Sequence, residues 1–486
     1  MKIRPVIILV LAAAVSLASC GSPPSASLPA ATATPLPHTP SAVPATSSPA
    51  PAPTAIPPEP SLSRAQYHLE AAYDPGRQEM VVSEKIIYPN LTGEDLDQLA
   101  LVIESSRTRG VFKLYQFAWG DMDGEEIESY TLADGLLLLP LRETLHPGEA
   151  IELFLVYSLT LPKQPGPFGY TGRQTNLTDW YAFVPPYTAQ RHWVYSPPGK
   201  VGEHLVYETA DFFVDIMIDD EDYRLAGPTA TEETQDGYRY YLREARAFSW
   251  SASKETLVFE YDQGGIPVSI HVFPEHRRAG EAALIVAGQA LEAFEEKFGP
   301  YPYQTLTLVE IDFGDGLESD GLFFIGEGFF EEFDGTVKNL FSILIAHETA
   351  HQWWYGQVGS HQALEPWVDE ALATYSELLF YEYHYPGSAA WWWEFRVEKY
   401  ALFEKVGGSI FQYQLFPNYV RGEYLQGAKF LQALREQIGD DAFFAALHEY
   451  LAAGTHKIMK GEDLLRIFAA HSDVDITPLI EAYFLK

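Results

Sequence analysis

The sequence contains very little cysteine. Of its 486 residues only Cys20 is a cysteine, so the chain cannot form an intramolecular disulfide. A cysteine-rich zinc site is excluded for the same reason. A metal site in this protein would have to use histidine and carboxylate ligands.

Basic residues are also scarce. The chain has 32 Lys and Arg residues against 67 Asp and Glu residues, and its formal net charge at pH 7 is −35. A surface this acidic repels the phosphate backbone of nucleic acids, so we expect no nucleic-acid partner. The acidity keeps the protein soluble and favours basic peptides, but it does not by itself identify a substrate.

The apolar stretch near the N-terminus is too short to cross a membrane. It covers residues 5–19, follows Lys2 and Arg4, and suits the core of an export signal better than a spanning helix of about 20 residues. It ends in Leu17-Ala18-Ser19-Cys20, which resembles a bacterial lipobox. We expect a lipoprotein signal peptide at 1–20, lipid attachment to Cys20, and anchoring at the outer face of a bacterial cell membrane. The alternative is an ordinary secretory signal with an incidental cysteine.

Residues 21–60 contain little besides Pro, Ala, Ser and Thr and have almost no charge. Such a segment buries no apolar surface and cannot offset the entropy lost on ordering. Its prolines favour an extended, semi-rigid spacer. We therefore expect a disordered linker between the lipid anchor and the folded part of the chain.

Short apolar segments rich in Tyr, Val, Ile and Phe follow the linker. They are separated by turn residues such as Asp74-Pro75-Gly76, a spacing typical of an all-β sandwich. We expect strands at 67–73, 79–88, 99–103, 136–141, 150–159, 211–218, 238–243 and 255–261. The prediction is an N-terminal β-sandwich domain at 61–265, followed by a mainly helical domain at 266–486.

An apolar helical stretch in the second domain carries His347-Glu348-x-x-His351. Residues four apart lie on one face of a helix, so the two imidazoles can hold one metal ion between them. Glu348 can then reach a water on that ion, which is the arrangement of zinc proteases. The alternative is that both histidines are structural and hydrogen-bond to backbone carbonyls.

A second helix, beginning near Pro366, favours the metal interpretation. It carries Glu370, eighteen intervening residues after His351. Catalytic zinc commonly takes three protein ligands and leaves a fourth position for water. His347, His351 and Glu370 would form such a set around one Zn²⁺.

These residues carry a resemblance to a known family. The spacing of the two histidines and Glu370 resembles that of the gluzincin metallopeptidases. The flanking sequences HETAHQWWYGQVG and WVDEALATY are similar specifically to the M1 aminopeptidase family. The resemblance implies an N-terminal β-domain followed by a thermolysin-like catalytic domain, one Zn²⁺ per chain, and the N-terminus of a peptide or protein as substrate.

Two further residues take their expected roles from this resemblance. Glu318, in Gly316-Leu317-Glu318-Ser319, lies where M1 enzymes carry a Gly-x-Met-Glu-Asn motif whose glutamate binds the substrate α-amine. Tyr424 matches a tyrosine that stabilises the oxyanion of the tetrahedral intermediate. The chain departs from the family pattern at Leu317 for Met, at Ser319 for Asn and at Gln426 for Lys.

We expect a zinc metallopeptidase that acts as an aminopeptidase, with Glu348 and Tyr424 catalytic, Glu318 binding substrate, and His347, His351 and Glu370 binding the metal. We expect the form that lacks the family's C-terminal helical domain, which would leave the cleft open. Two alternatives remain. One is a zinc endopeptidase with an open cleft, and the other is a non-catalytic, surface-anchored binding or scaffold protein.

Overall fold

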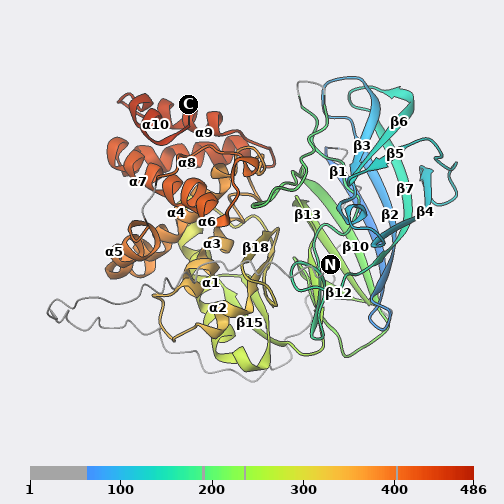
Figure 1. Ribbon diagram of the computed structural model, residues 1–486, viewed down its shortest axis with the longest axis horizontal. Coiled ribbons are helices and arrows are strands. Elements are labelled where there is room, and N and C mark those ends of the chain that lie inside the picture. The colour runs from blue at the N-terminus through green and yellow to red at the C-terminus, as the bar shows by residue number, and fades with distance from the viewer. Residues whose placement is uncertain (1–62, 189–191, 235–236, 401–402, 486) are drawn as a thin grey trace, which may run out of the picture.

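The structure is a computed structural model that describes residues 63–188, 192–234, 237–400 and 403–485 (Figure 1). The predicted signal peptide at 1–20, the lipidation residue Cys20 and the linker at 21–60 lie outside the described residues. No helix in the described part of the chain has the length and apolar character needed to cross a membrane.

The first half of the described chain is built from β-sheets. Its largest sheet has seven strands in the order β12-β13-β10-β1-β2-β7-β4, and smaller sheets have the orders β11-β14-β9-β8 and β3-β6-β5. The strands are β1 Ala65–Asp74, β2 Glu79–Pro89, β3 Leu96–Val102, β4 Phe112–Trp119, β5 Thr131–Ala133, β6 Leu136–Leu145, β7 Ala150–Thr160, β8 Phe168–Tyr170, β9 Gln174–Leu177, β10 Ala210–Ile218, β11 Arg224–Ala226, β12 Thr231–Glu233, β13 Gly237–Ala245 and β14 Trp250–Ser253.

Alternation along the strands explains how these sheets pack. In β1, Leu69, Ala71 and Tyr73 are buried, whereas the alternate residues Ala72 and Asp74 are exposed. This is the period of two that a half-buried strand requires. The buried faces meet around Trp180 and Trp250, whose rings cross edge to face at 6.4 Å. Large aromatic side chains bury much apolar area and so dominate this core.

The second half combines one mixed sheet with helices. The sheet has the order β15-β16-β17-β19-β18, with β15 Leu257–Gln263, β16 Ile266–Val272, β17 Leu306–Ile311, β18 Gly316–Ser319 and β19 Leu322–Gly326. The α-helices are α1 Arg277–Phe298, α2 Glu327–Glu331, α3 Leu340–Ala350, α4 Trp367–His384, α5 Ala389–Trp392, α6 Phe416–Tyr419, α7 Gly427–Ile438, α8 Asp440–Gly454, α9 Gly461–Ala470 and α10 Thr477–Tyr483. Figure 1 shows the β-sheet half and the helical half as two neighbouring blocks.

This arrangement confirms the predicted fold class, a β-sheet region followed by a mainly helical domain. The predicted boundary between residues 265 and 266 falls inside the hairpin of β15 and β16, because these two strands pair over their full length. Strand β15 therefore belongs to the sheet of the helical half. The sequence pattern identified the strand correctly but could not show which sheet it joins.

Helix α3, which carries His347 and Glu348, is a short helix of 11 residues. It begins at Leu340 because the side chain of Asn339 accepts a hydrogen bond from the Ser342 amide, a typical N-cap. It ends at Ala350, and the backbone of His351 still has helical angles at the C-cap position. The metal-binding motif therefore lies at the end of a helix rather than in its middle.

Arg246 connects the two halves of the molecule. This buried residue follows β13 and donates hydrogen bonds to the carbonyl oxygens of Tyr355 at 2.6 Å and Lys457 at 2.8 Å, both in the helical half. It also donates to the carbonyl of Tyr207 in the β-sheet half at 2.9 Å. A guanidinium carries five donors in a planar fork, so one side chain can satisfy several carbonyls that the interface buries.

Candidate metal centre and active site

Three buried side chains from two helices converge on one point. His347 and His351 lie four residues apart at the end of α3, and their Nε2 atoms are 3.1 Å from each other. Glu370, in the first turn of α4, places Oε2 3.3 Å from Nε2 of His347 and 3.6 Å from Nε2 of His351. The structure thus brings together the three residues that the sequence predicts as metal ligands, with ligand atoms within 4.8 Å of one another.

The hydrogen bonds around the two imidazoles show that this cluster fits a metal ion. Nδ1 of His347 lies 3.0 Å from a carboxylate oxygen of Glu377, and Nδ1 of His351 lies 2.8 Å from the carbonyl oxygen of Trp354. Because these oxygens accept, each Nδ1 carries a proton, and each Nε2 of a neutral ring presents a lone pair. Oε2 of Glu370 is buried and has no hydrogen-bond partner among the described residues. Two imidazole nitrogens and a carboxylate oxygen are a common ligand set of catalytic zinc.

The electrostatics of the cluster favour positive charge. Burial would lower the pKa of His347, but the neighbouring carboxylates of Glu370 and Glu377 outweigh burial and raise that pKa to about 9. Burial would likewise raise the pKa of Glu370, but the imidazoles of His347 and His351, 3.3 Å and 3.6 Å from its Oε2, lower it to about 2. Opposite charges placed this close stabilise each other. A divalent cation would supply the same positive charge at the same place.

Glu348 lies beside the cluster on α3. Its carboxyl is buried, Oε2 has no hydrogen-bond partner among the described residues, and burial raises its pKa to about 8 against the opposing influence of His347 and His351. The backbone of β18 passes close by. A Cβ at Gly316 would come 2.1 Å from Oε1 of Glu348, so only glycine leaves room for this carboxylate.

Tyr424 reaches the cluster from a π-helical turn, η6, over Val420–Gln426. Its hydroxyl donates to Oε1 of Glu370, and its ring stacks on His347 with centroids 5.7 Å apart. Burial and the charge of Glu370 hold the pKa of Tyr424 well above its usual value, so the phenol keeps its proton and stays a donor. Single π-turns inside helices are frequent at functional sites. Oε1 of Gln426, at the end of this turn, is buried and has no partner in the described part of the chain.

Glu318 lies on β18, which is the edge strand of the five-stranded sheet. Its Oε1 accepts a hydrogen bond from Nε2 of Gln362 at 2.9 Å. Its carboxylate also belongs to a second group of neighbouring ligand atoms together with Glu348 and His351. Glu318 therefore lies next to the metal ligands, on a strand whose outer edge can pair with an extended peptide.

The end of α3 is fixed to the turn after Glu318. Gln352 donates from Nε2 to the carbonyl of Ser319 at 3.0 Å and accepts at Oε1 from the amide of Gly321 at 2.8 Å. The hydroxyl of Ser319 is buried and lies 2.9 Å from that of Ser249 in the β-sheet half. The serine at the position where the family has Asn thus contributes to packing between the halves.

The sequence analysis missed Glu377. This carboxylate is fully buried and receives hydrogen bonds from His347, from Nε1 of Trp392 at 3.0 Å and from Nε of Arg396 at 3.0 Å. It lies seven residues after Glu370, which is two helical turns, so both carboxylates occupy one face of α4. That spacing was visible in the sequence, and it could have identified Glu377 as a carboxylate that orients His347.

We predict that Glu377→Gln weakens zinc binding about 10- to 100-fold, because the amide orients His347 less strongly and leaves Arg396 without its counter-ion. Competition with a chromogenic chelator measures the affinity. Glu382→Gln is the matched control on the same helix, since Glu382 pairs with Arg435 rather than with a metal-binding residue. Equal zinc affinity in Glu377→Gln and the unaltered protein would contradict the role of Glu377.

A comparison with protein families gives one match to this half of the chain. Residues 282–483 match the family described as Peptidase family M1 domain. This range includes the metal cluster, Glu318, Glu348, Glu377 and Tyr424.

Curated relatives match a similar region. Endoplasmic reticulum aminopeptidase 1 of Homo sapiens is 28% identical over 230 residues, which cover 43% of this chain and 24% of the relative. Aminopeptidase N of Lactobacillus helveticus is 25% identical over 302 residues, which cover 56% of this chain and 35% of that protein. The matched regions thus span well under half the length of these relatives.

Solved structures extend the likeness to the whole fold. The crystal structure of an M1 zinc metallopeptidase from Deinococcus radiodurans superimposes with a TM-score of 0.61 at 17% sequence identity, covering 86% of this chain and 92% of that one. A mutant of that enzyme bound to the substrate Tyr-Ser-Ala gives the same TM-score, 0.61. At this identity the likeness shows the fold alone. Residues 282–483, which match the domain of peptidase family M1, hold the buried cluster of His347, His351 and Glu370.

Proposed function

We propose that this protein is a zinc-dependent metallopeptidase that removes N-terminal residues from peptides. The observation that carries the proposal is the convergence of His347, His351 and Glu370, with the carboxyl of Glu348 beside them and no hydrogen-bond partner for its Oε2 among the described residues. The match of residues 282–483 to the domain of peptidase family M1 supports the same function. We expect one Zn²⁺ per chain.

His347, His351 and Glu370 would hold the metal and leave one side open to substrate and water. A bound Zn²⁺ supplies Lewis acidity, which polarises the scissile carbonyl and makes water a better nucleophile near neutral pH. Glu348 takes a proton from the attacking water and passes it to the leaving amine. A carboxyl whose pKa lies near 8 in the metal-free protein is suited to both halves of this transfer once a cation lowers that pKa.

Tyr424 stabilises the negative charge that forms on the carbonyl oxygen. Its hydroxyl already lies at the cluster, where it donates to Glu370. Redirecting that donor to the substrate oxygen would favour the transition state, a contribution of about 3 kcal/mol in comparable acyl-transfer sites. The buried environment that keeps Tyr424 protonated also strengthens the new hydrogen bond.

Glu318 gives the enzyme its preference for a free N-terminus. A substrate that pairs with the edge of β18 would bring its α-ammonium to this carboxylate, and charge-assisted hydrogen bonds are about twice as strong as neutral ones. A relative by fold, the mutant metallopeptidase from Deinococcus radiodurans, has been solved with the tripeptide Tyr-Ser-Ala bound. We therefore propose short peptides and peptide N-termini as substrates.

We predict that Glu348→Gln keeps its zinc but loses hydrolysis by at least about a hundredfold, because the amide cannot accept the proton from water. Metal analysis and turnover of aminoacyl reporter substrates measure the two properties on one preparation. A chelator should abolish the activity of the unaltered protein, and added Zn²⁺ should restore it. Undiminished turnover in Glu348→Gln would refute the mechanism.

We predict that a peptide with a free α-amine is cleaved about 10- to 100-fold faster than its N-acetylated form, because acetylation removes the charge that Glu318 binds. Glu318→Gln should reduce this preference while leaving the zinc content unchanged. Equal rates for the two peptides in the unaltered protein would favour the endopeptidase alternative instead.

We also propose that the enzyme is exported and held at the outer face of a bacterial membrane by a lipid on Cys20. The support is the lipobox-like Leu17-Ala18-Ser19-Cys20 behind a short apolar run. Expressed as the full chain in a bacterium, the protein should fractionate with membranes, and Cys20→Ser should move it to the soluble fraction. A secretory signal without lipid attachment predicts that both forms are soluble.

A further inference from the structure

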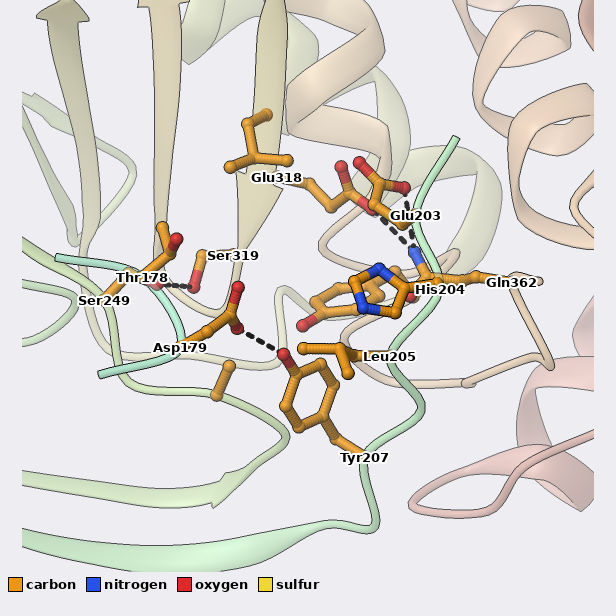
Figure 2. Close-up of a pocket in the computed structure, with 13 residues that line it drawn as sticks. Thr178, Asp179, Glu203, His204, Leu205, Tyr207, Ser249, Glu318, Ser319 and Gln362 are labelled. Atoms are coloured by element: carbon orange, nitrogen blue, oxygen red, sulfur yellow. Dashed lines mark hydrogen bonds between the residues drawn. The ribbon is translucent and has the colours of Figure 1, made fainter. Parts of the chain in front are cut away.

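A cavity of about 80 Å³ lies where the β-sheet half meets the edge strand β18 (Figure 2). Glu318 is on its wall, and the same carboxylate neighbours Glu348 and His351 of the metal site. The cavity is therefore the space next to the point where a substrate α-amine would be held. A side chain projecting from the first residue of the substrate would enter it.

Much of the cavity wall is apolar. It is formed by Leu205, Tyr207, Ala247, Leu317 and Tyr355, which come from both halves of the molecule. A wall of this kind accommodates methylene groups. By itself it would suit an aliphatic or aromatic side chain, and it would also suit the stem of a long basic one.

The remaining wall carries three carboxyl groups. Glu203 and Glu318 both accept hydrogen bonds from the single amide of Gln362, at 3.2 Å and 2.9 Å, as Figure 2 shows. Asp179 lies on the same wall and accepts a hydrogen bond from the hydroxyl of Tyr207. Glu203 and Asp179 belong to the β-sheet half, so this half adds two carboxylates to the cleft of the metal-binding half.

Little positive charge offsets these carboxylates. Among the described residues that line the cavity, His204 is the one basic side chain, and its Nε2 lies 3.5 Å from an oxygen of Glu104. Burial and, next, the charge of Glu318 raise the pKa of Glu203 well above its usual value. Burial raises the pKa of Asp179 as well. A cation that entered the cavity would stabilise the charged forms of both carboxyls.

The positions of two lining residues are set by unusual backbone angles. Asp179 has a φ of 52° and Tyr355 a φ of 133°, backbone angles that residues other than glycine rarely adopt. Strain of this kind indicates no ligand on its own. It does show that the surrounding structure holds the acidic and the aromatic wall in place.

We propose that this cavity receives the side chain of the first substrate residue and selects a cationic one, lysine or arginine, through Asp179 and Glu203. The inference rests on the proposed aminopeptidase function. The methylenes of the substrate side chain would lie along Leu205, Tyr207 and Tyr355, and its charged end would meet the carboxylates.

Paired substrates separate this proposal from recognition of the α-amine. Lysine and norleucine have side chains of similar length and the same α-amine, and they differ in the terminal charge. Charge-assisted recognition predicts a ratio of kcat/KM for lysyl over norleucyl reporter substrates of about tenfold or more. Any effect on α-amine binding changes both rates equally and cancels in this ratio.

The ratio should fall toward one in Asp179→Asn and Glu203→Gln, and further in the double variant. Glu128→Gln is the control, since Glu128 is an exposed carboxylate of the β-sheet half that does not line the cavity. Zinc content and the rate on the norleucyl substrate show whether each variant is folded and active. A ratio near one in the unaltered protein, or a high ratio that survives in the double variant, would overturn the proposal.

A binding measurement keeps the two proposals distinguishable. Titration calorimetry of the zinc-loaded Glu348→Gln variant with lysine amide and norleucine amide reads side-chain preference without turnover. Tighter binding of lysine amide by about tenfold supports the cavity assignment even if no substrate is hydrolysed. Equal binding of the two amides refutes it, whereas absence of turnover with a normal binding preference refutes only the proposed catalysis.

Discussion

The structure depends on placing three electron-pair donors at one buried point. Two imidazoles and a carboxylate with no intervening cation would be costly there, because Oε2 of Glu370 has no hydrogen-bond partner among the described residues and the two Nε2 atoms face each other at 3.1 Å. The surrounding packing explains how the arrangement is maintained. Glu377 and the Trp354 carbonyl fix the imidazole orientations, and Asn339 fixes the start of the helix that carries them.

Negative charge dominates the neighbourhood of the cluster. Glu318, Glu348, Glu370 and Glu377 all lie within a short distance of the two histidines, while Arg396 is the guanidinium that pairs with this group, through Glu377. Buried carboxylates repel one another unless a cation or a proton lies between them. A metal ion at the histidines and an ammonium group near Glu318 would each reduce that repulsion. The proposed chemistry and the proposed substrate preference thus follow from the same excess of carboxylates.

The cleft belongs to both halves of the molecule. The helical half supplies the metal ligands, Glu348 and Tyr424, and the β-sheet half supplies Asp179 and Glu203. Arg246 helps to set the distance between these groups by donating to carbonyl oxygens of both halves, and Gln352 fixes the end of α3 to the turn after Glu318. Misplacement of reacting groups by about 1 Å can reduce catalysis a hundredfold, so contacts remote from the metal contribute to the site.

Local sequence patterns did not predict strands such as β4, β9 and β14. They were enough to predict β1, β2, β3, β6, β7, β10, β13 and β15, the two helices of the metal site and the cluster of His347, His351 and Glu370. These features depend on periodicities of two and of about 3.6 residues, and on the spacing of ligand types along a helix. The same patterns identified β15 as a strand, but its sheet depends on pairing with β16, which a single strand does not encode.

The sequence by itself determined which side chains could bind a metal and which helices would carry them. The tertiary structure alone decided that Glu377 orients His347, that a cavity adjoins Glu318, and that Asp179 and Glu203 line it. Residues far apart in the chain meet only when packing of the two halves brings their backbones together. No local sequence pattern specifies these tertiary contacts, because the free energy that stabilises them comes from packing between segments distant in the sequence.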